Sequence, residues 1–277
     1  MKTELLKLDK KQGKLSFILK NANTAFANAI RRNAVEEVPV MAIEDVEFRS
    51  NSSVLYDEII AHRLGLIPLK TDLKSYNLPG KCKCNNKGCA MCQLKLKLKA
   101  RGQRTVYASE IKSTDPKIKP VYPKIPIIKL LKGQKLEFEA TAILGKGKEH
   151  AKWCPGLVYY KNMPIININK KCKNPDLVVE QCPQGVFEVK NNRLVLNKDN
   201  SLKCHLCDAC VDICEPKGAV TVDKNKNEFI FYVESWGQLS CKEIIEEALK
   251  TIKNSSEEFI KEIKKKAKPQ KKPKRKK

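Results

Sequence analysis

Four cysteines stand close together in the stretch KCHLCDACVDICEPKG, residues 203–218. Cys204, Cys207, Cys210 and Cys214 follow the spacing C-x2-C-x2-C-x3-C, and a Glu-Pro pair comes after the last of them. Short, regular spacing of this kind lets one loop wrap an iron–sulfur cluster with its thiolates and backbone N–H groups. The stretch therefore predicts a cluster site.

A degenerate copy of this run lies just upstream, in CKNPDLVVEQCPQG, residues 172–185. Cys172 and Cys182 are spaced like the first and fourth cysteines of a complete run, but Pro175 and Val178 fill the two middle positions. In two-cluster ferredoxins the fourth cysteine of each run ligates the other cluster. This exchange predicts one 4Fe–4S cluster with four ligands: Cys182, Cys204, Cys207 and Cys210.

A second cluster would have too few ligands to assemble. Cys172 and Cys214 should therefore lie next to each other, as free thiols or as a disulfide. If Cys182 is too distant, three cysteines could hold a 3Fe–4S form instead. His205 lies between two ligands and is interpreted as a spacer. The cluster either braces a small domain by adding its binding energy to folding, or it has a redox or oxygen-sensing role.

A second cysteine group occurs in CKCNNKGCAMC, residues 82–92, with the spacing C-x-C-x4-C-x2-C. Four thiolates this close can form a tetrahedral zinc site, and a site with four protein ligands leaves no open position for catalysis. The chain has twelve cysteines, and in a reducing compartment metal ligation is favoured over disulfides. We therefore predict a structural zinc site with the ligands Cys82, Cys84, Cys89 and Cys92. The alternative is that these four cysteines are reactive thiols or form disulfides. Cys154 and Cys241 have no such partners and are predicted to be core residues.

Positive charge is the strongest feature of the composition. Lys and Arg number 55 against 31 Asp and Glu, a net charge of +24. Such a balance favours nucleic acid or an acidic partner, because neutralising phosphates releases condensed counterions. The alternative is that lysines provide solubility or stability at high temperature. No apolar stretch is long enough for a secretory or membrane segment, so a soluble cytoplasmic protein is expected.

The two ends of the chain predict pieces of one α+β domain. Residues 4–20 alternate as a hairpin, and residues 23–37 form a helix with a thin apolar stripe. Residues 228–236 predict a strand, and the capping box S-x-x-E from Ser240 to Glu243 opens a C-terminal helix. The segments between them would then be insertions.

The middle of the chain predicts two such insertions. One is β-rich, and its segment LKLKLKA, residues 94–100, alternates between apolar and charged positions. The other holds the cysteine runs. The predicted segments are 1–45 and 225–265 for the split domain, 46–168 for the β-rich domain with the zinc loop, 169–224 for the ferredoxin-like domain, and 266–277 for a disordered basic tail.

Three further stretches resemble the α-like subunits of multisubunit RNA polymerases. They are NANTAFANAIRRNAVEEVPVMAIEDVEF (21–48), DEIIAHRLGLIPL (57–69) and KEHAKWCPGLVYY (148–160). The second and third are similar to signatures of the D-type subunits of archaeal RNA polymerases and of the third-largest subunit of eukaryotic RNA polymerase II. The resemblance covers residues 1–265 in the same order and includes both cysteine groups.

This resemblance implies an α+β fold in which a split α-like dimerisation domain forms a heterodimer with the small α-like subunit L. A helix with Phe26 and Ile30 and a C-terminal helix with Ile245, Leu249 and Ile252 would pack on that partner. Subunits N and P and the large catalytic subunits would then join the complex.

The expected function is that of a non-catalytic assembly platform in DNA-directed RNA polymerase, a nucleotidyltransferase complex. This chain would contact DNA only indirectly, through the complex. Polymerase chemistry uses two metal ions held by clustered carboxylates. Asp57-Glu58 and the pair Asp208 and Asp212 are interpreted as surface charges instead, and His62 as structural. The alternatives are a free-standing iron–sulfur electron carrier and a zinc-dependent nucleic-acid binder.

Overall fold

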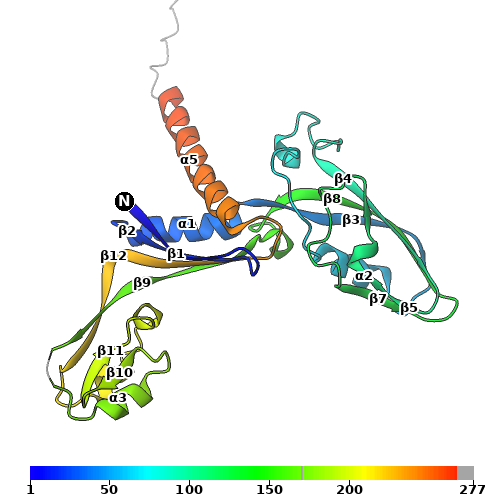
Figure 1. Ribbon diagram of the computed structural model, residues 1–277. Helices are drawn as coiled ribbons and strands as arrows, with labels where there is room; N and C mark the ends of the chain where they lie inside the picture. Colours follow the sequence, from blue (N-terminus) through cyan, green and yellow to red (C-terminus); the bar gives the residue numbers. More distant parts are fainter. Residues whose placement is uncertain (170, 267–277) are drawn as a thin grey trace, which may run out of the picture. The chain divides into compact units, whose positions relative to one another are not determined.

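The computed structural model describes residues 1–169 and 171–266 (Figure 1). The chain groups into two compact units. The first unit comprises Met1–Leu8, Ser16–Asn28 and Tyr159–Tyr232. The second comprises Asp9–Leu15, Ala29–Val158 and the described residues from Val233 onward. The five-segment division predicted above stays a prediction.

The first unit is built on a four-stranded sheet with the order β1-β2-β12-β9. Its strands are β1 (Lys2–Asp9), β2 (Lys14–Lys20), β12 (Val220–Ser235) and β9 (Gly156–Ile168). Aromatic rings pack across it: Phe17 stacks on Phe231 at 5.1 Å, and Tyr160 meets Phe229 edge-on at 5.4 Å. Such ring pairs add to the energy of burial. The predicted 4–20 hairpin corresponds to β1 and β2.

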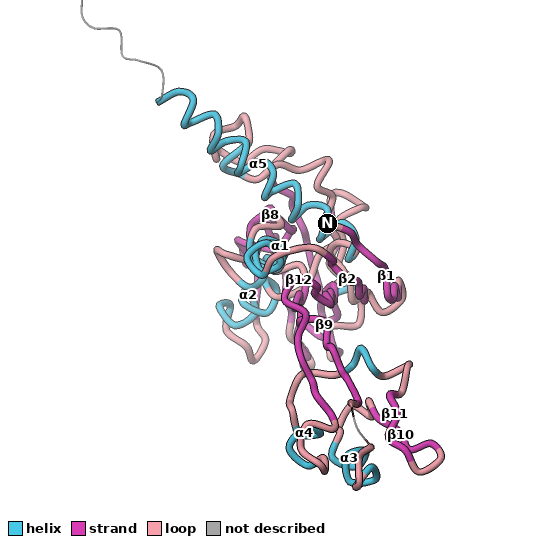
Figure 2. Tube along the Cα trace, turned by 90° about the vertical axis from the view of Figure 1, so that its left-hand side faces the viewer, coloured by secondary structure: helices cyan, strands magenta, loops and turns pink. Residues whose placement is uncertain are grey.

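A small cysteine-rich module follows where β9 and β12 extend away from the other two strands, as Figures 1 and 2 both show. It contains α3 (Pro175–Gln181), β10 (Phe187–Lys190), β11 (Arg193–Leu196) and α4 (Ala209–Ile213). The strands β10 and β11 pair antiparallel around Asn191 and Asn192, which both have positive φ as a tight hairpin turn requires. We call residues 172–219 the cysteine module.

The core of this module is unusually rich in cysteine. Its buried residues, together with Val220 at the start of β12, are Cys172, Val178, Val186, Phe187, Leu194, Cys210, Cys214 and Ala219. So few apolar side chains give a small module little burial energy, and modules of this size commonly need a metal or disulfide to fold stably.

The second unit has its own sheet, in the order β3-β8-β4-β6. The strands are β3 (Pro39–Asn51), β8 (Lys135–Lys146), β4 (Gln93–Arg101) and β6 (Lys112–Ser113). A two-stranded sheet of β5 (Arg104–Tyr107) and β7 (Pro126–Leu130) and the helix α2 (Asp57–Gly65) complete its core.

The alternation predicted for residues 94–100 is confirmed on β4. Leu94, Leu96 and Leu98 are buried, while Lys97 and Lys99 point outward. The outward lysines form cross-strand ion pairs with β8, Lys97 with Glu139 and Lys99 with Glu137. These exposed pairs add little stability each, so the buried leucine row is what fixes the register.

Helix α1 (Thr24–Glu36) begins where the sequence predicts. The Asn23 side chain accepts a hydrogen bond from the Phe26 N–H at 2.8 Å, which makes Asn23 the N-cap. Ala27, Ile30 and Ala34 are buried, so the thin apolar stripe faces the interior of the chain itself.

Helix α5 (Cys241–Lys266) is a single helix of 26 residues. The predicted capping box is present: the Glu243 N–H donates to Ser240 Oγ at 3.3 Å, and the Ser240 N–H donates to the Glu243 carboxylate at 2.8 Å. The predicted basic tail lies outside the described residues from position 267 onward. In the described part of the chain, no helix has the length and apolarity needed to cross a membrane.

Gly147 marks a close approach of two backbone segments in the second unit. A methyl group at this position would overlap the carbonyl oxygen of Val35, a backbone atom that no side-chain rotation can move. We expect Gly147→Ala to destabilise the second unit by about 1–3 kcal/mol. Chemical denaturation measures this, and Gly80→Ala, where nothing lies within 4 Å, is the control. Equal stability of the two variants would contradict the packing described here.

Candidate metal centres

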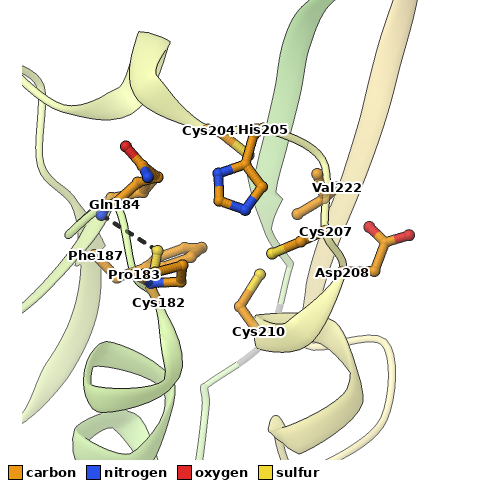
Figure 3. Close-up of a pocket in the computed structure, with 11 residues that line it drawn as sticks. Cys182, Pro183, Gln184, Phe187, Cys204, His205, Cys207, Asp208, Cys210 and Val222 are labelled. Carbon is orange, nitrogen blue, oxygen red and sulfur yellow. Dashed lines mark hydrogen bonds between the residues drawn. The ribbon is translucent and has the colours of Figure 1, made fainter.

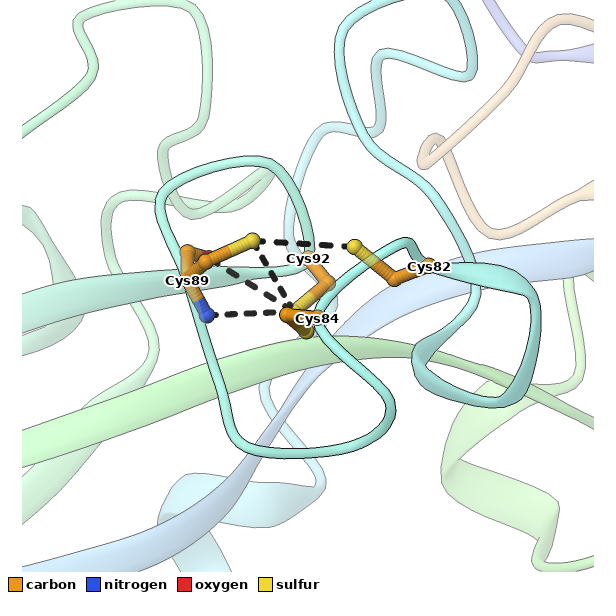
Figure 4. A group of neighbouring side chains, drawn as sticks. All are labelled: Cys82, Cys84, Cys89 and Cys92. Atoms are coloured by element: carbon orange, nitrogen blue, oxygen red, sulfur yellow. Dashed lines mark hydrogen bonds between the residues drawn. The ribbon is translucent and has the colours of Figure 1, made fainter.

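The loop at residues 82–92 brings four sulfur atoms together (Figure 4). The Sγ atoms of Cys82, Cys84, Cys89 and Cys92 all lie within 4.8 Å of one another. Three separations are 3.6 Å (Cys82 to Cys89), 3.5 Å (Cys84 to Cys92) and 3.8 Å (Cys89 to Cys92). Metal–sulfur bonds of about 2.3 Å in a tetrahedron place sulfurs about 3.8 Å apart. These cysteines could therefore hold one metal ion.

Backbone turns shape this loop. Asn85, Asn86 and Gly88 all have positive φ, a conformation that asparagine and glycine adopt most readily. A side chain at Gly88 would also overlap the amide of Gln93. The Cys89 N–H donates to Cys92 Sγ at 3.3 Å, so the backbone already stabilises negative charge on one sulfur.

Cys84 and Cys92 differ in pKa because burial and shared hydrogen bonds act on them differently. Burial raises the pKa of Cys92 to about 12. Burial also acts on Cys84, but hydrogen bonds from Cys92 and Cys82 outweigh it and lower the pKa of Cys84 to about 7. Since metal ligands must be thiolates, binding an ion at neutral pH displaces the proton of Cys92 and makes affinity fall at lower pH.

A second group of cysteines lines a cavity in the cysteine module (Figure 3). Cys182 follows the end of α3 on one side, and Cys207 and Cys210 lie across from it (Figure 3). Cys204 completes the set. The four residues predicted from the sequence as cluster ligands thus lie around one cavity, and their ligation of a cluster stays a prediction. Apolar groups complete the wall: Pro183, Val186, Phe187 and Val222.

The loop from Cys204 to Cys210 has an unusual backbone. Leu206 and Asp208 both have positive φ, which is rare for residues other than glycine and costs about 1–3 kcal/mol each. Alternating left- and right-handed residues turn successive N–H groups into one concavity, an arrangement found around anions and iron–sulfur clusters. On the opposite wall, the Val186 N–H donates to Cys182 Sγ at 3.5 Å.

The cavity disfavours thiolates in the absence of a cation. Burial, together with the charges of Cys182, Cys204 and Cys207, raises the pKa of Cys210 to about 11. Burial likewise raises the pKa of Cys204. A positively charged metal core would reverse this repulsion, so the donor set fits an iron–sulfur cluster.

Cys172 and Cys214 lie close together as predicted, with their sulfurs 3.0 Å apart and both side chains buried. Both are free thiols in this structure. Asn174 holds their two segments together: its Oδ1 accepts from the Glu215 N–H at 2.9 Å, and its Nδ2 donates to the Ile213 carbonyl at 2.8 Å.

The carboxylates interpreted as surface charges are exposed. They are Asp57, Glu58, Asp208 and Asp212, and His62 is exposed as well. Of the two cysteines predicted to be core residues, Cys241 is buried, but Cys154 is only half-buried and donates to the Gly156 carbonyl at 3.2 Å.

Sequence reasoning missed part of the cavity wall. The His205 ring, interpreted above as a spacer, and Asp208 both line the cavity (Figure 3). Both residues lie between predicted ligands in the sequence, and this position could have indicated that they line the cavity.

The role of Asn174 leads to a test. Asn174→Ala removes the hydrogen bonds to the Glu215 N–H and to the part-buried Ile213 carbonyl, so we expect the cysteine module to lose about 1–3 kcal/mol of stability. Asn174→Asp keeps the acceptor and should lose less. Hydrogen exchange at residues 213–219 distinguishes them. Identical protection in the wild type and the Ala variant would contradict this role.

Comparison with known proteins identifies the chain's family. Residues 43–154 match the model of the RNA polymerase Rpb3/RpoA insert domain. DNA-directed RNA polymerase subunit Rpo3 of Methanosarcina acetivorans is 40% identical, over 94% of this chain and 97% of that protein. Rpo3 of Archaeoglobus fulgidus is 39% identical, over 95% of this chain and 98% of that protein. Rpo3 of Pyrococcus furiosus is 38% identical, over 93% of this chain and 96% of that protein. These matches do not favour a free-standing electron carrier. The chain belongs to the Rpo3 family of DNA-directed RNA polymerase subunits.

Proposed function

We propose that this chain is a non-catalytic assembly platform of an archaeal DNA-directed RNA polymerase, acting in the cytoplasm and meeting DNA only through the complex. The observation that carries this proposal is the nearly full-length similarity to three proteins named as polymerase subunits. An assembly role needs surfaces that partners cover and an internal frame that keeps those surfaces in place.

We infer that the small α-like subunit L covers α5. Leu249, Phe259, Ile260 and Ile263 share one face of that helix, and between 39% and 64% of each side chain is exposed. Helix α1 offers less than the resemblance implies, because Ile30 is buried in its own chain and Phe26 is half-buried. Most of the pairing surface therefore lies on α5. Subunits N and P and the large catalytic subunits are the further proposed partners.

The pairing surface has a direct test. Leu249→Asp would bury an unpaired carboxylate in an apolar helix contact, which we expect to weaken pairing with L at least a hundredfold. Asn254→Asp places the same carboxylate on the opposite face of α5 and is the matched control. Analytical ultracentrifugation of the mixed subunits measures both. Unchanged pairing of the Leu249 variant would remove α5 from the interface.

We propose that the loop at residues 82–92 binds zinc in a structural role. The sulfur separations support a single tetrahedral ion, and four protein ligands leave no site for a substrate. We expect about one zinc per chain, lost in Cys89→Ser together with hydrogen-exchange protection around Gln93. Cys154→Ser should keep its zinc. Elemental analysis decides the matter, and zinc retained in Cys89→Ser would overturn the ligand assignment.

We propose that Cys182, Cys204, Cys207 and Cys210 hold one 4Fe–4S cluster. The shared cavity, the left-handed loop residues and the mutual repulsion of the thiolates support this. The bound cluster would link the end of α3 to the 204–210 loop and so supply the stability that the small core lacks. We assign it a structural role. A 3Fe–4S form would need only three of these ligands.

A single ligand variant tests the structural role. Cys207→Ser should abolish the brown absorbance, loosen residues 172–219 and reduce assembly with the large subunits, whereas Cys154→Ser should change none of these. Absorbance, limited proteolysis and co-purification provide the measurements. A Cys207 variant that assembles and transcribes normally would refute the structural role, whatever its iron content.

A further inference from the structure

Lys161, a lysine of β9 in the first unit, contacts the loop that carries three of the proposed cluster ligands. Its Nζ donates a hydrogen bond to the carbonyl oxygen of Cys204 at 2.8 Å. The same ammonium lies 5.8 Å from the centre of the Tyr232 ring on β12. The side chain is half-buried. A positive charge is thus held against the backbone of one of the proposed cluster ligands.

Comparison with other sheltered lysines shows what Lys161 lacks. Lys152, whose side chain is 13% exposed, is paired with Glu44, and Lys146, at 29%, is paired with Glu37. Within the described residues, Lys161 has no carboxylate within ion-pair distance. Removing a charge from water is costly unless an opposite charge compensates. The aromatic ring and one carbonyl compensate only in part.

We propose that Lys161 is the counter-charge of the iron–sulfur cluster, which rests on the proposed presence of that cluster. Four cysteine thiolates carry more negative charge than the 4Fe–4S core carries positive charge, so the bound centre is anionic. Lys161 sits beside the ligand loop on the side of the sheet. It therefore attracts the anionic centre and fixes the loop to β9 through the same ammonium.

Two measurable consequences follow from this placement. Accepting an electron makes the cluster more negative, so a nearby cation favours the reduced form and raises the reduction potential. The cation also favours the assembled, anionic centre over the empty site. Lys161 is a positioning residue, because it acts through the Cys204 loop without ligating iron.

Three variants separate charge from packing. Lys161→Met removes the charge and the donor but keeps an unbranched chain, and Lys161→Arg keeps the charge. Lys203→Met removes an equal charge from an exposed lysine next to Cys204, where water screens it. The full-length chain is purified anaerobically, and the cluster is titrated with dithionite while electron paramagnetic resonance follows its reduction.

We expect Lys161→Met to lower the reduction equilibrium constant about tenfold, equivalent to about 59 mV for a one-electron couple. Lys161→Arg and Lys203→Met should stay near the wild type. If Lys161→Met loses its cluster while Lys161→Arg keeps it, this difference in cluster content supports the counter-charge role in place of the potentials. Equal potentials in Lys161→Met and Lys203→Met, or equal cluster loss in the Met and Arg variants, would overturn the role of Lys161. A wild-type chain without iron would instead overturn the cluster itself.

Discussion

Burial of thiols that must ionise to bind a metal is the constraint on which both cysteine sites depend. A thiolate removed from water is unfavourable, as the raised pKa values of Cys92 and Cys210 show, and at Cys210 the charges of neighbouring cysteines add to the effect of burial. The chain nonetheless holds four sulfurs within 4.8 Å of one another in the loop at residues 82–92, and it lines one cavity with four further cysteines, where Leu206 and Asp208 adopt left-handed conformations. A fold does not keep such an arrangement for packing alone. A bound cation would make the same arrangement favourable, and this is the physical reason for proposing a metal at each site.

The first unit shows how a cluster would support a platform. The strand β9 leads into the cysteine module and β12 leads out of it, so the module is connected to the four-stranded sheet through two of its strands (Figures 1 and 2). Its own apolar core is small. Without a metal centre, the ends of both strands would lose their packing, and the order of the sheet beyond Lys161 would weaken with them. A structural cluster would therefore serve the assembly role by keeping the ends of these two strands ordered.

Local signals in the sequence predicted local features well. The alternation in residues 94–100, the capping box at Ser240 and the proximity of Cys172 and Cys214 all depend on spacing along a short segment or on a known repeat, and the structure confirms each. The four cavity cysteines also come together where the repeat rule placed them, although their ligation of iron stays a proposal.

Features decided by distant contacts were not predictable in the same way. The strand β12 continues through the polar segment DKNKNE, where no apolar alternation indicates a strand, because pairing with neighbouring strands stabilises it. Ile30 belongs to the apolar stripe of α1, but the stripe alone does not show whether Ile30 packs in the chain's own core or against a partner subunit. Lys161 had no signal at all, since its contact with Cys204 joins residues 43 positions apart.

Metal content of the chain isolated anaerobically from its native polymerase tests the central claim most directly. Elemental analysis combined with electron paramagnetic resonance should give about four iron and about one zinc per chain, with the signal of a single reduced 4Fe–4S cluster. A fully folded chain in an intact polymerase with neither metal would contradict the account.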